Sequence, residues 1–298
     1  MSGVMERTVE QVAADAGVAL VRTRAEVRAW VAARRREGKR IGLVPTMGYL
    51  HAGHLSLVDR ARRTADAVAM SIFVNPLQFG PSEDLDRYPR NLERDLELAG
   101  GAGTELVFAP PAGEMYPHGE PRVSILPDAE IGGRMDGGSR PGHFRGVLTV
   151  VAKLFGIFTP DVAVFGQKDW QQATLIRRMV ADLDIAVEVD VAPIVREPDG
   201  LAMSSRNVYL SPQERASARA LSRALEAVRA RYAAGERDAA VLRNALWSGI
   251  SAPGVDPEYA VVADPETLAD AERAGHGTLL AVAARVGSTR LIDNALLP

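Results

Sequence analysis

Residues 41–54 read IGLVPTMGYLHAGH, an apolar run followed by a short loop and two histidines. The run at 40–45 has the length and apolarity of a buried β-strand, which Pro45 closes. Residues 53–67 place apolar side chains at helical spacing, and 68–74 form a second β-rich run. Because strand, helix and strand follow one another, we expect a parallel βαβ unit with a right-handed crossover.

The same alternation extends to both sides of this unit. The pattern predicts helices at 23–39, 91–103, 144–158 and 170–183, and strands at 105–110 and 162–166. Such alternation is typical of an α/β fold with a Rossmann-like, doubly wound parallel sheet, which binds ligands at the carboxyl ends of its strands. The Gly- and Pro-rich stretch 110–144 is predicted to be a long excursion outside the sheet, of the kind that often forms a binding loop or lid.

A different pattern begins after residue 194. Ser211 and Glu214 have the spacing of a capping box, and Pro212 occupies the first helical position, so a helix is expected to begin there. The expected elements of this part are helices at 212–235 and 238–250 and strands at 257–264, 278–287 and 289–297. We therefore predict a Rossmann-like domain at 1–194 and a small α+β domain at 195–298.

The composition limits the classes of function. With 47% hydrophobic and 24% charged residues, the chain of 298 residues can bury a substantial core. Its formal net charge of −3 provides no overall field for nucleic acid or an anionic membrane, so we expect neither as a partner. The lack of cysteine excludes disulfides and thiol nucleophiles and favours a cytoplasmic location. The first twenty residues do not resemble a signal peptide, and no run approaches the about 18 apolar residues of a membrane span.

His51 and His54 are two of only five histidines in the chain. Positions i and i+3 share a helix face, so both imidazoles can point the same way from the helix start. That end of a helix offers unpaired N–H groups and a positive dipole, and Gly53 allows close approach, which together suit an anion. Spacing alone leaves two other interpretations: capping or surface histidines, and a zinc site, although no third ligand stands nearby.

Five blocks of sequence, in order along the chain, make the interpretation more specific. They are PTMGYLHAGHLSLV at 45–58, FVNPLQFGPSEDLDRYPR at 73–90, GHFRGVLTVVAKLF at 142–155, VFGQKDWQQ at 164–172 and REPDGLAMSSRN at 196–207. HAGH is similar to the HxGH signature of the nucleotidyltransferase superfamily, and the blocks together resemble the pantothenate synthetase family. The resemblance implies that ATP and (R)-pantoate give pantoyl adenylate and pyrophosphate, and that β-alanine then displaces AMP to give pantothenate, a precursor of coenzyme A.

The same resemblance implies the ligands and the assembly. ATP is expected as a substrate, with Mg²⁺ held chiefly by its phosphates and no metal site built by the protein alone. Pantoate and β-alanine are the expected small-molecule partners, and the family implies a homodimer. Glu93 and Asp95, which could contribute to Mg²⁺ binding, are interpreted instead as part of a charged, solvated helix face.

Site residues follow by matching positions to the family motifs. Those expected at ATP are Met47, Gly48, Tyr49, Leu50, His51, Ala52, Gly53, His54, Gly166, Gln167, Lys168, Asp169, Val195, Met203, Ser204, Ser205 and Arg206. Among them, catalytic roles are expected for His51, His54, Lys168, Ser204, Ser205 and Arg206, because carboxylate attack on the α-phosphate needs cations and donors at the phosphates. Gln78 and Gln172 match the pantoate-binding positions, Gln78 also matches a β-alanine contact, and Tyr88 and His143 are further pocket candidates.

Three points qualify this assignment. His54 is the family's proton donor, but a fixed imidazolium charge fits the motif equally well. MSSR at 203–206 resembles the KMSKS loop of class I aminoacyl-tRNA synthetases, and domain closure is expected to bring it onto ATP. Tyr49 and Ala52 depart from the common family loop GALHEGH, where a small residue and an acid stand.

Two alternative functions share part of the pattern. An HxGH adenylyltransferase acting on a phosphorylated acceptor would use the same histidines but gives no reason for the paired glutamines. A class I synthetase fragment or an RNA-binding relative fits neither the net charge nor the small C-terminal part.

Overall fold

The computed structural model describes residues 7–81 and 83–298, which form two compact units. The first comprises the described residues up to Leu126 together with Gly142–Phe165 and Ile176–Ala192. The second comprises Pro127–Pro141, Gly166–Leu175 and Pro193–Pro298. The division of the chain into domains at residue 194 stays a prediction, and the first six residues of the N-terminal leader lie outside the described part.

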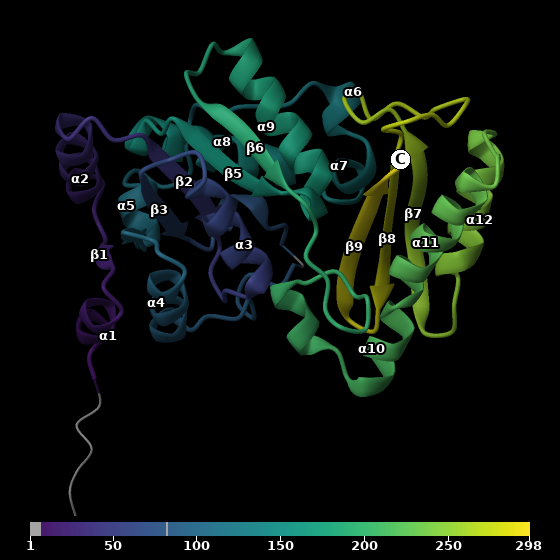
Figure 1. Ribbon diagram of the computed structural model, residues 1–298, viewed down its shortest axis with the longest axis horizontal. Coiled ribbons are helices and arrows are strands. Elements are labelled where there is room, and N and C mark those ends of the chain that lie inside the picture. Colours follow the sequence, from purple (N-terminus) through teal and green to yellow (C-terminus); the bar gives the residue numbers. More distant parts are fainter. Residues whose placement is uncertain (1–6, 82) are drawn as a thin grey trace, which may run out of the picture. The chain divides into compact units, whose positions relative to one another are not determined.

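A six-stranded sheet with the order β1-β4-β3-β2-β5-β6 forms the centre of the first unit. Its strands are β1 (Ala19–Val21), β2 (Ile41–Thr46), β3 (Ala67–Ile72), β4 (Leu106–Phe108), β5 (Val162–Gly166) and β6 (Glu188–Ala192). The pairs from β1 through β4, β3 and β2 to β5 are parallel. The predicted Rossmann-like fold is confirmed, and Figure 1 shows helices beside this sheet. The edge strands β1 and β6 were not predicted.

Five helices of this part of the chain follow the predicted alternation: α2 (Arg24–Arg36), α3 (Ala52–Ala61), α4 (Leu92–Gly101), α8 (His143–Phe158) and α9 (Trp170–Asp182). The shorter helices α1 (Val9–Asp15), η1 (Pro76–Gln78) and α5 (Ala112–Met115) were not predicted. α8 is buried nearly all round, as expected for a helix that is apolar on most faces. A Cβ at Gly146 would collide with the backbone of Leu77, so glycine lets α8 pack directly on η1.

The second unit contains a three-stranded antiparallel sheet with the order β7-β8-β9. Its elements are α6 (Ala129–Gly132), α7 (Met135–Ser139), η2 (Gln167–Asp169), η3 (Ser205–Tyr209), α10 (Pro212–Ala218), α11 (Ala220–Ala233), α12 (Ala239–Ile250), β7 (Val255–Ala263), β8 (Leu279–Val286) and β9 (Thr289–Leu296). α11 and α12 cover the sheet (Figure 1) and share a buried core with it. The predicted small α+β unit and the capping box of Ser211 and Glu214 are confirmed.

Two predicted segments differ in detail. The helix expected at 212–235 is interrupted at Arg219, whose guanidinium donates to the backbone carbonyl of Asp199 at 3.2 Å. The stretch 110–144 lies outside the sheets, as predicted, but carries the short helices α5, α6 and α7. Both differences involve contacts between segments that are distant in sequence, which a local pattern does not encode.

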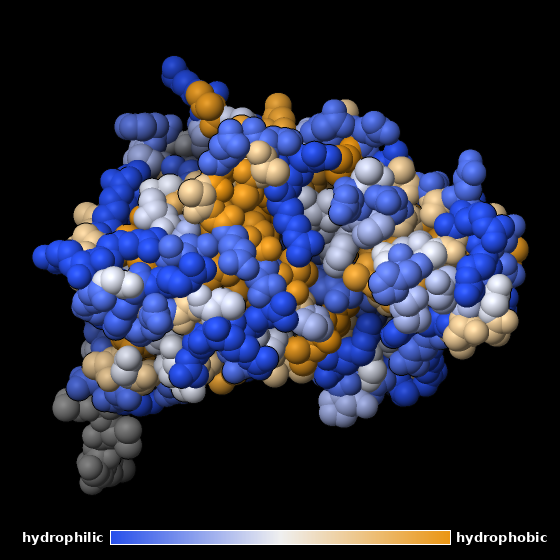
Figure 2. Space-filling model, turned by 45° about the horizontal axis from the view of Figure 1, so that its top comes forward, coloured by the Kyte–Doolittle hydropathy of each residue, from blue (hydrophilic) through white to orange (hydrophobic). Residues whose placement is uncertain are grey.

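The surface is largely polar on the face that Figure 2 shows, where hydrophobic side chains appear between hydrophilic ones. The large hydrophobic side chains exposed in the described part of the chain are Val123, Leu126, Leu183, Val208, Val241 and Trp247. Within residues 7–81 and 83–298, no helix has both the length and the apolarity needed to cross a bilayer.

The core of the first unit predicts one stability effect. Phe108 on β4 is fully buried and packs edge to face against Phe158, with ring centroids 5.9 Å apart. Phe108→Ala removes this packing and leaves a cavity, which should lower the free energy of unfolding of this unit by about 3–5 kcal/mol. Urea denaturation followed by the fluorescence of Trp30, with Trp170 and Trp247 replaced by phenylalanine, measures the change. Val123→Ala, at an 87% exposed position, is the control and should change it by less than about 0.5 kcal/mol.

Candidate active site

The two histidines lie where β2 passes into α3. His51 is the N-cap residue of α3, with an extended backbone at φ −144° and ψ 172°, and His54 lies in the first turn. Their rings stack with centroids 4.0 Å apart and an interplanar angle of 29°. The predicted common orientation is therefore confirmed, although His51 precedes the helix. Two imidazoles and the start of a helix come together at the carboxyl end of a parallel strand, which suits an anionic ligand.

The loop before His51 has an unusual backbone. Gly48 has φ +88°, and a Cβ there would approach Cγ2 of Ile72 to 2.8 Å, so both its conformation and its surroundings require glycine. Tyr49 also has a positive φ, of 51°. A non-glycine residue in this region is strained and persists only where surrounding contacts hold it.

Asp95 of α4 supplies those contacts. Its Oδ2 accepts the backbone N–H of Tyr49 and its Oδ1 that of Leu50, both at 2.7 Å. Arg94 adds a bond of 2.9 Å to the carbonyl of Leu50 and places its guanidinium 5.3 Å from the ring centroid of Tyr49. Asp95 is 1% exposed, and burial raises the pKa of its carboxyl while the two backbone donors oppose that rise. The interpretation of Asp95 as part of a solvated helix face was wrong.

A sequence signal for the burial of Asp95 does exist. Asp95 falls on the same stripe of α4 as Leu92, Leu96 and Ala99, whose spacing of three and four residues marks the face toward the core. Glu93 points to the exposed side of the same helix, as expected. An acid on a buried stripe needs donors close by, and the loop after β2 provides them.

Gln78 belongs to a second polar group of the first unit, at the end of η1. Its Nε2 donates to Sδ of Met47 at 3.1 Å, and its Oε1 accepts a bond of 3.2 Å from Nδ2 of Asn75. Nδ1 of His143 lies 2.7 Å from the backbone carbonyl oxygen of Gln78. Three predicted site residues, Met47, Gln78 and His143, are thus brought together, and Tyr88 is buried and makes a T-shaped ring contact with Phe79.

Asn75 and Tyr116 support this group and were not predicted. The hydroxyl of Tyr116 donates to Oδ1 of Asn75 at 2.8 Å, and Asn75 donates in turn to the carbonyl of Gly146 at 3.1 Å. Burial raises the pKa of Tyr116, so its hydroxyl remains a donor. Asn75 lies within the quoted block 73–90, but Tyr116 comes from the Gly- and Pro-rich excursion and carried no motif.

Lys168 lies on η2, directly after β5, and belongs to the second unit. Its side chain is 21% exposed, with Nζ 3.7 Å from Oδ2 of Asp169. The two glutamines that follow it differ. Gln171 is buried, accepts the N–H of Asp136 at 3.0 Å and donates to the carbonyls of Ile131 and Arg134, both at 2.9 Å. Gln172 is only partly buried.

The remaining predicted residues lie on a braced loop of the second unit. Met203 donates its N–H to the carbonyl of Val195 at 3.0 Å, which closes the loop. Ser204 caps η3 by accepting the N–H of Arg206 at 3.3 Å, and Ser205 is buried. Side chains brace the loop further, with bonds from Asn207 to Glu197 at 2.6 Å and from Arg215 to Glu197 and Asp199 at 2.5 and 2.9 Å.

The described residues offer no ready-made metal centre: in 7–81 and 83–298, His, Asp and Glu side chains form no group of three or more suited to a cation.

The contacts of Asp95 predict local protection of the histidine loop. Asp95→Asn places an amide N–H₂ group opposite one of the two backbone N–H groups, which then lacks an acceptor. This loss should lower the local stability of the loop by about 1–3 kcal/mol. Amide hydrogen exchange at Tyr49 and Leu50 should become faster, by about 5- to 150-fold for that energy. Glu97→Gln on the exposed side of α4 is the matched control and should leave both amides unchanged. Unaltered exchange in Asp95→Asn would show that other contacts hold the loop.

Comparison with known proteins places the chain in a family. The family model for pantoate-β-alanine ligase matches residues 19–296. The pantothenate synthetase of Moorella thermoacetica is 55% identical over 280 residues, covering 93% of this chain and 98% of that protein.

Solved structures agree with this placement. The crystal structure of pantothenate synthetase from Thermus thermophilus has a TM-score of 0.89 at 47% identity, covering 94% of this chain and 100% of that chain. The pantoate-β-alanine ligase from Francisella tularensis, complexed with βγ-ATP and β-alanine, has a TM-score of 0.78 at 32% identity, covering 94% and 97%. A fold, a histidine loop and a match over nearly the whole chain lead to one conclusion: the chain belongs to the pantoate-β-alanine ligase family.

Proposed function

We propose that this chain condenses (R)-pantoate with β-alanine to pantothenate at the expense of ATP, through a pantoyl adenylate, with release of AMP and pyrophosphate. The observation that carries the proposal is the stacked pair His51 and His54 at the end of β2, in a chain that matches the ligase family over residues 19–296. The Francisella relative with βγ-ATP and β-alanine supports the choice of two of the three substrates.

In the first step, a carboxylate oxygen of pantoate attacks the α-phosphorus of ATP. The bond from that phosphorus to the bridging oxygen breaks, and pyrophosphate departs with the electron pair. Since anions approach one another, the reaction depends on positioning and on cations at the phosphates. His51, His54 and Lys168 supply cationic or donor groups, and Ser204, Ser205 and Arg206 supply two hydroxyls and a guanidinium.

In the second step, the amine nitrogen of β-alanine attacks the acyl carbon of the adenylate. The bond from that carbon to the phosphate-bound oxygen breaks, so AMP leaves with an oxygen that came from pantoate. Gln78 and Gln172 are proposed to hold pantoate, because an amide both donates and accepts and can bind hydroxyl and carboxylate groups without adding charge. The bonds from Asn75 and to Met47 fix which end of the Gln78 amide faces each way.

The remaining ATP contacts are proposed on the segments that flank the two histidines, Lys168 and the loop 203–206. They are Met47, Gly48, Tyr49, Leu50, Ala52, Gly53, Gly166, Gln167, Asp169, Val195 and Met203. Mg²⁺ is proposed to enter with ATP and to neutralise phosphate charge. We propose a homodimeric enzyme, as the family resemblance implies, that works in the cytoplasm, which the lack of cysteine favours. Light scattering after size-exclusion chromatography should give twice the mass of one chain.

A product assay tests the function itself. The purified protein with ATP, Mg²⁺, pantoate and β-alanine should release AMP and pyrophosphate and form pantothenate. AMP release should require both acids, because the adenylate stays bound until the amine attacks it. An adenylyltransferase would instead release pyrophosphate with a phosphorylated acceptor and without an amine. The proposal fails if no AMP forms when both acids are present.

The charged side chains predict a loss of turnover. His54→Ala and Lys168→Ala should each lower kcat by about 10²- to 10³-fold, as for removal of one transition-state donor, and should change the KM for pantoate less. Steady-state kinetics measures both constants. His118→Ala and Lys39→Ala are the matched controls, because they change a histidine and a lysine that are not among the proposed site residues. Near-normal turnover in either site variant contradicts its role.

The two adjacent glutamines predict opposite outcomes. Gln172→Ala should raise the KM for pantoate and leave the melting temperature unchanged, because this side chain is only partly buried. Gln171→Ala leaves three backbone groups of the segment 131–136, which are buried or partly buried, without their bonds and should lower the melting temperature. Calorimetry and kinetics on both variants separate the effects. If Gln171→Ala instead gave a stable protein with a raised KM for pantoate, Gln171 rather than Gln172 would be the pantoate-binding residue.

A further inference from the structure

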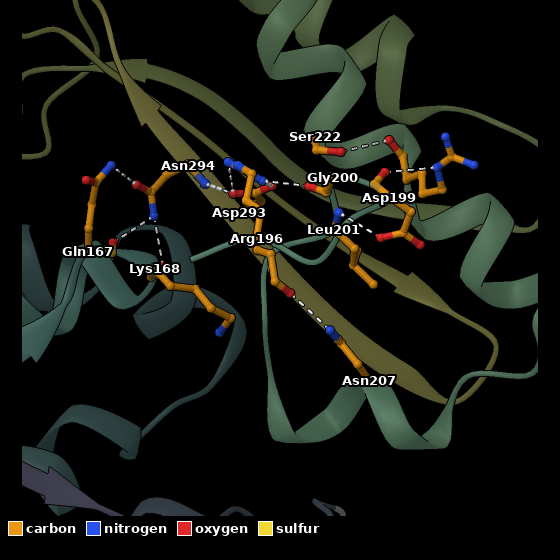
Figure 3. A network of polar contacts seen from close by, with 12 residues as sticks. Gln167, Lys168, Arg196, Asp199, Gly200, Leu201, Asn207, Ser222, Asp293 and Asn294 are labelled. Carbon is orange, nitrogen blue, oxygen red and sulfur yellow. Dashed lines mark hydrogen bonds and ion pairs between the residues drawn. The ribbon is translucent and has the colours of Figure 1, made fainter. Parts of the chain in front are cut away.

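Two adjacent polar residues of β9, Asp293 and Asn294, are almost completely buried, at 2% and 3% exposure. Successive side chains of a strand point to opposite faces, so neighbours can hold different segments of chain. Figure 3 shows this arrangement: Asn294 faces Gln167 and Lys168, whereas Asp293 faces Arg196. The two segments that they contact carry the proposed phosphate-binding groups of the second unit.

Asn294 makes three bonds to η2. Its Nδ2 donates to the backbone carbonyls of Gln167 and Lys168, at 2.9 and 2.8 Å, and its Oδ1 accepts Nε2 of Gln167 at 3.2 Å. The amide therefore holds the backbone of Lys168, while the lysine side chain runs away from it (Figure 3). Only a side chain with two donors on one nitrogen can bind both carbonyls in this way.

Asp293 holds the other segment through Arg196. The guanidinium binds both carboxylate oxygens, with NH1 to Oδ2 at 2.7 Å and NH2 to Oδ1 at 3.0 Å, and NH1 also donates to the carbonyl of Gly200 at 3.1 Å. Arg196 pairs with Ala202 in a β-bridge, immediately before Met203. The strand is thus joined to the base of the loop that presents Ser204, Ser205 and Arg206.

An ion pair with one buried and one partly buried partner, such as Asp293 and Arg196, is weak evidence for a contribution to stability, because desolvation of the charges offsets much of their attraction. A bidentate pair does fix geometry, since both partners are planar and accept few orientations. We propose that Asp293 and Asn294 are positioning residues, which tie Lys168 and the loop 196–206 to one strand and so fix the spacing of these phosphate-binding groups. The inference rests on the proposed function, since it is ATP that the groups are to bind.

A double-mutant cycle on ATP binding tests this proposal. Asn294→Asp keeps the size of the side chain and replaces both donors by an acceptor. It should weaken binding of β,γ-methylene ATP, measured by calorimetry on the full chain, by about 10- to 100-fold, as expected for a misplaced contact group. If Asn294 acts through Lys168, the added loss in a Lys168→Ala background should be much smaller. Likewise, the loss of affinity caused by Asp293→Asn should be much smaller in an Arg206→Ala background.

Three further variants keep the test decisive. Asn294→Ser retains one donor and should give an intermediate loss, and it replaces Asn294→Asp if that protein does not fold. Arg196→Lys keeps the charge without the two-pronged geometry and should resemble Asp293→Asn. Leu291→Ala, in the buried core on the same strand, should lower the melting temperature and leave the affinity unchanged.

Two results would overturn the positioning role. One is a double variant whose loss of affinity equals the product of the single losses within about twofold, since independent sites add in free energy. The other is a loss in Leu291→Ala as large as that in Asn294→Asp, which would assign the effect to general destabilisation. Wild-type protein that binds the analogue and makes no pantothenate would contradict the proposed function alone. If the wild-type protein makes pantothenate but the losses of affinity in the single variants multiply in the double variant, only the positioning role is contradicted.

Discussion

The parallel pairing of β2 with β3 on one side and β5 on the other is the constraint on which the candidate site depends. The chain proceeds from β2 through β3 and β4 toward one edge of the sheet and then returns to place β5 and β6 on the other side. In such sheets the direction in which successive strands are added reverses between two neighbouring strands, and ligands bind outside the carboxyl ends of those strands. The histidine loop leaves β2 at that end of the sheet, and β5 ends there at Gly166.

Buried polar groups hold the residues that are proposed to meet the ligands. In the first unit, Asp95 holds the backbone of Tyr49 and Leu50, and Asn75 with Tyr116 holds the amide of Gln78. In the second unit, Asn294 holds the backbone of Lys168. Each support is a buried side chain with its hydrogen bonds made, and such groups lose little freedom during a reaction. Preorganisation of this kind lets donors and charges act without rearrangement when the transition state forms.

The fold was largely predictable from local pattern, because the buried strands and the amphipathic helices carry clear periodicity. β1 and β6 were missed, since one has only three residues and both lie at edges where exposed side chains weaken the apolar signal. The break at Arg219 was missed because it coincides with a contact to a distant loop.

The candidate site was predictable to a different degree. His51, His54 and Lys168 were singled out because they match the family motifs, and their roles stay proposals. Their supports were not found: Asp95 was taken for a surface acid, although its position on the apolar stripe of α4 signals burial. Asn294 and Asp293 lie more than a hundred residues from Lys168, in a strand whose pattern predicted only an element of a sheet. Their role depends on tertiary contacts that a single sequence does not display.

The central claim is that a carboxylate oxygen of pantoate becomes bonded to the α-phosphorus of ATP before the amide forms. Pantoate labelled with ¹⁸O in its carboxylate, incubated with the enzyme, ATP, Mg²⁺ and β-alanine, tests it directly by mass spectrometry of the products. The account predicts one labelled oxygen in the phosphate of AMP for each pantothenate formed. Label in orthophosphate, or AMP without label while pantothenate accumulates, would contradict it.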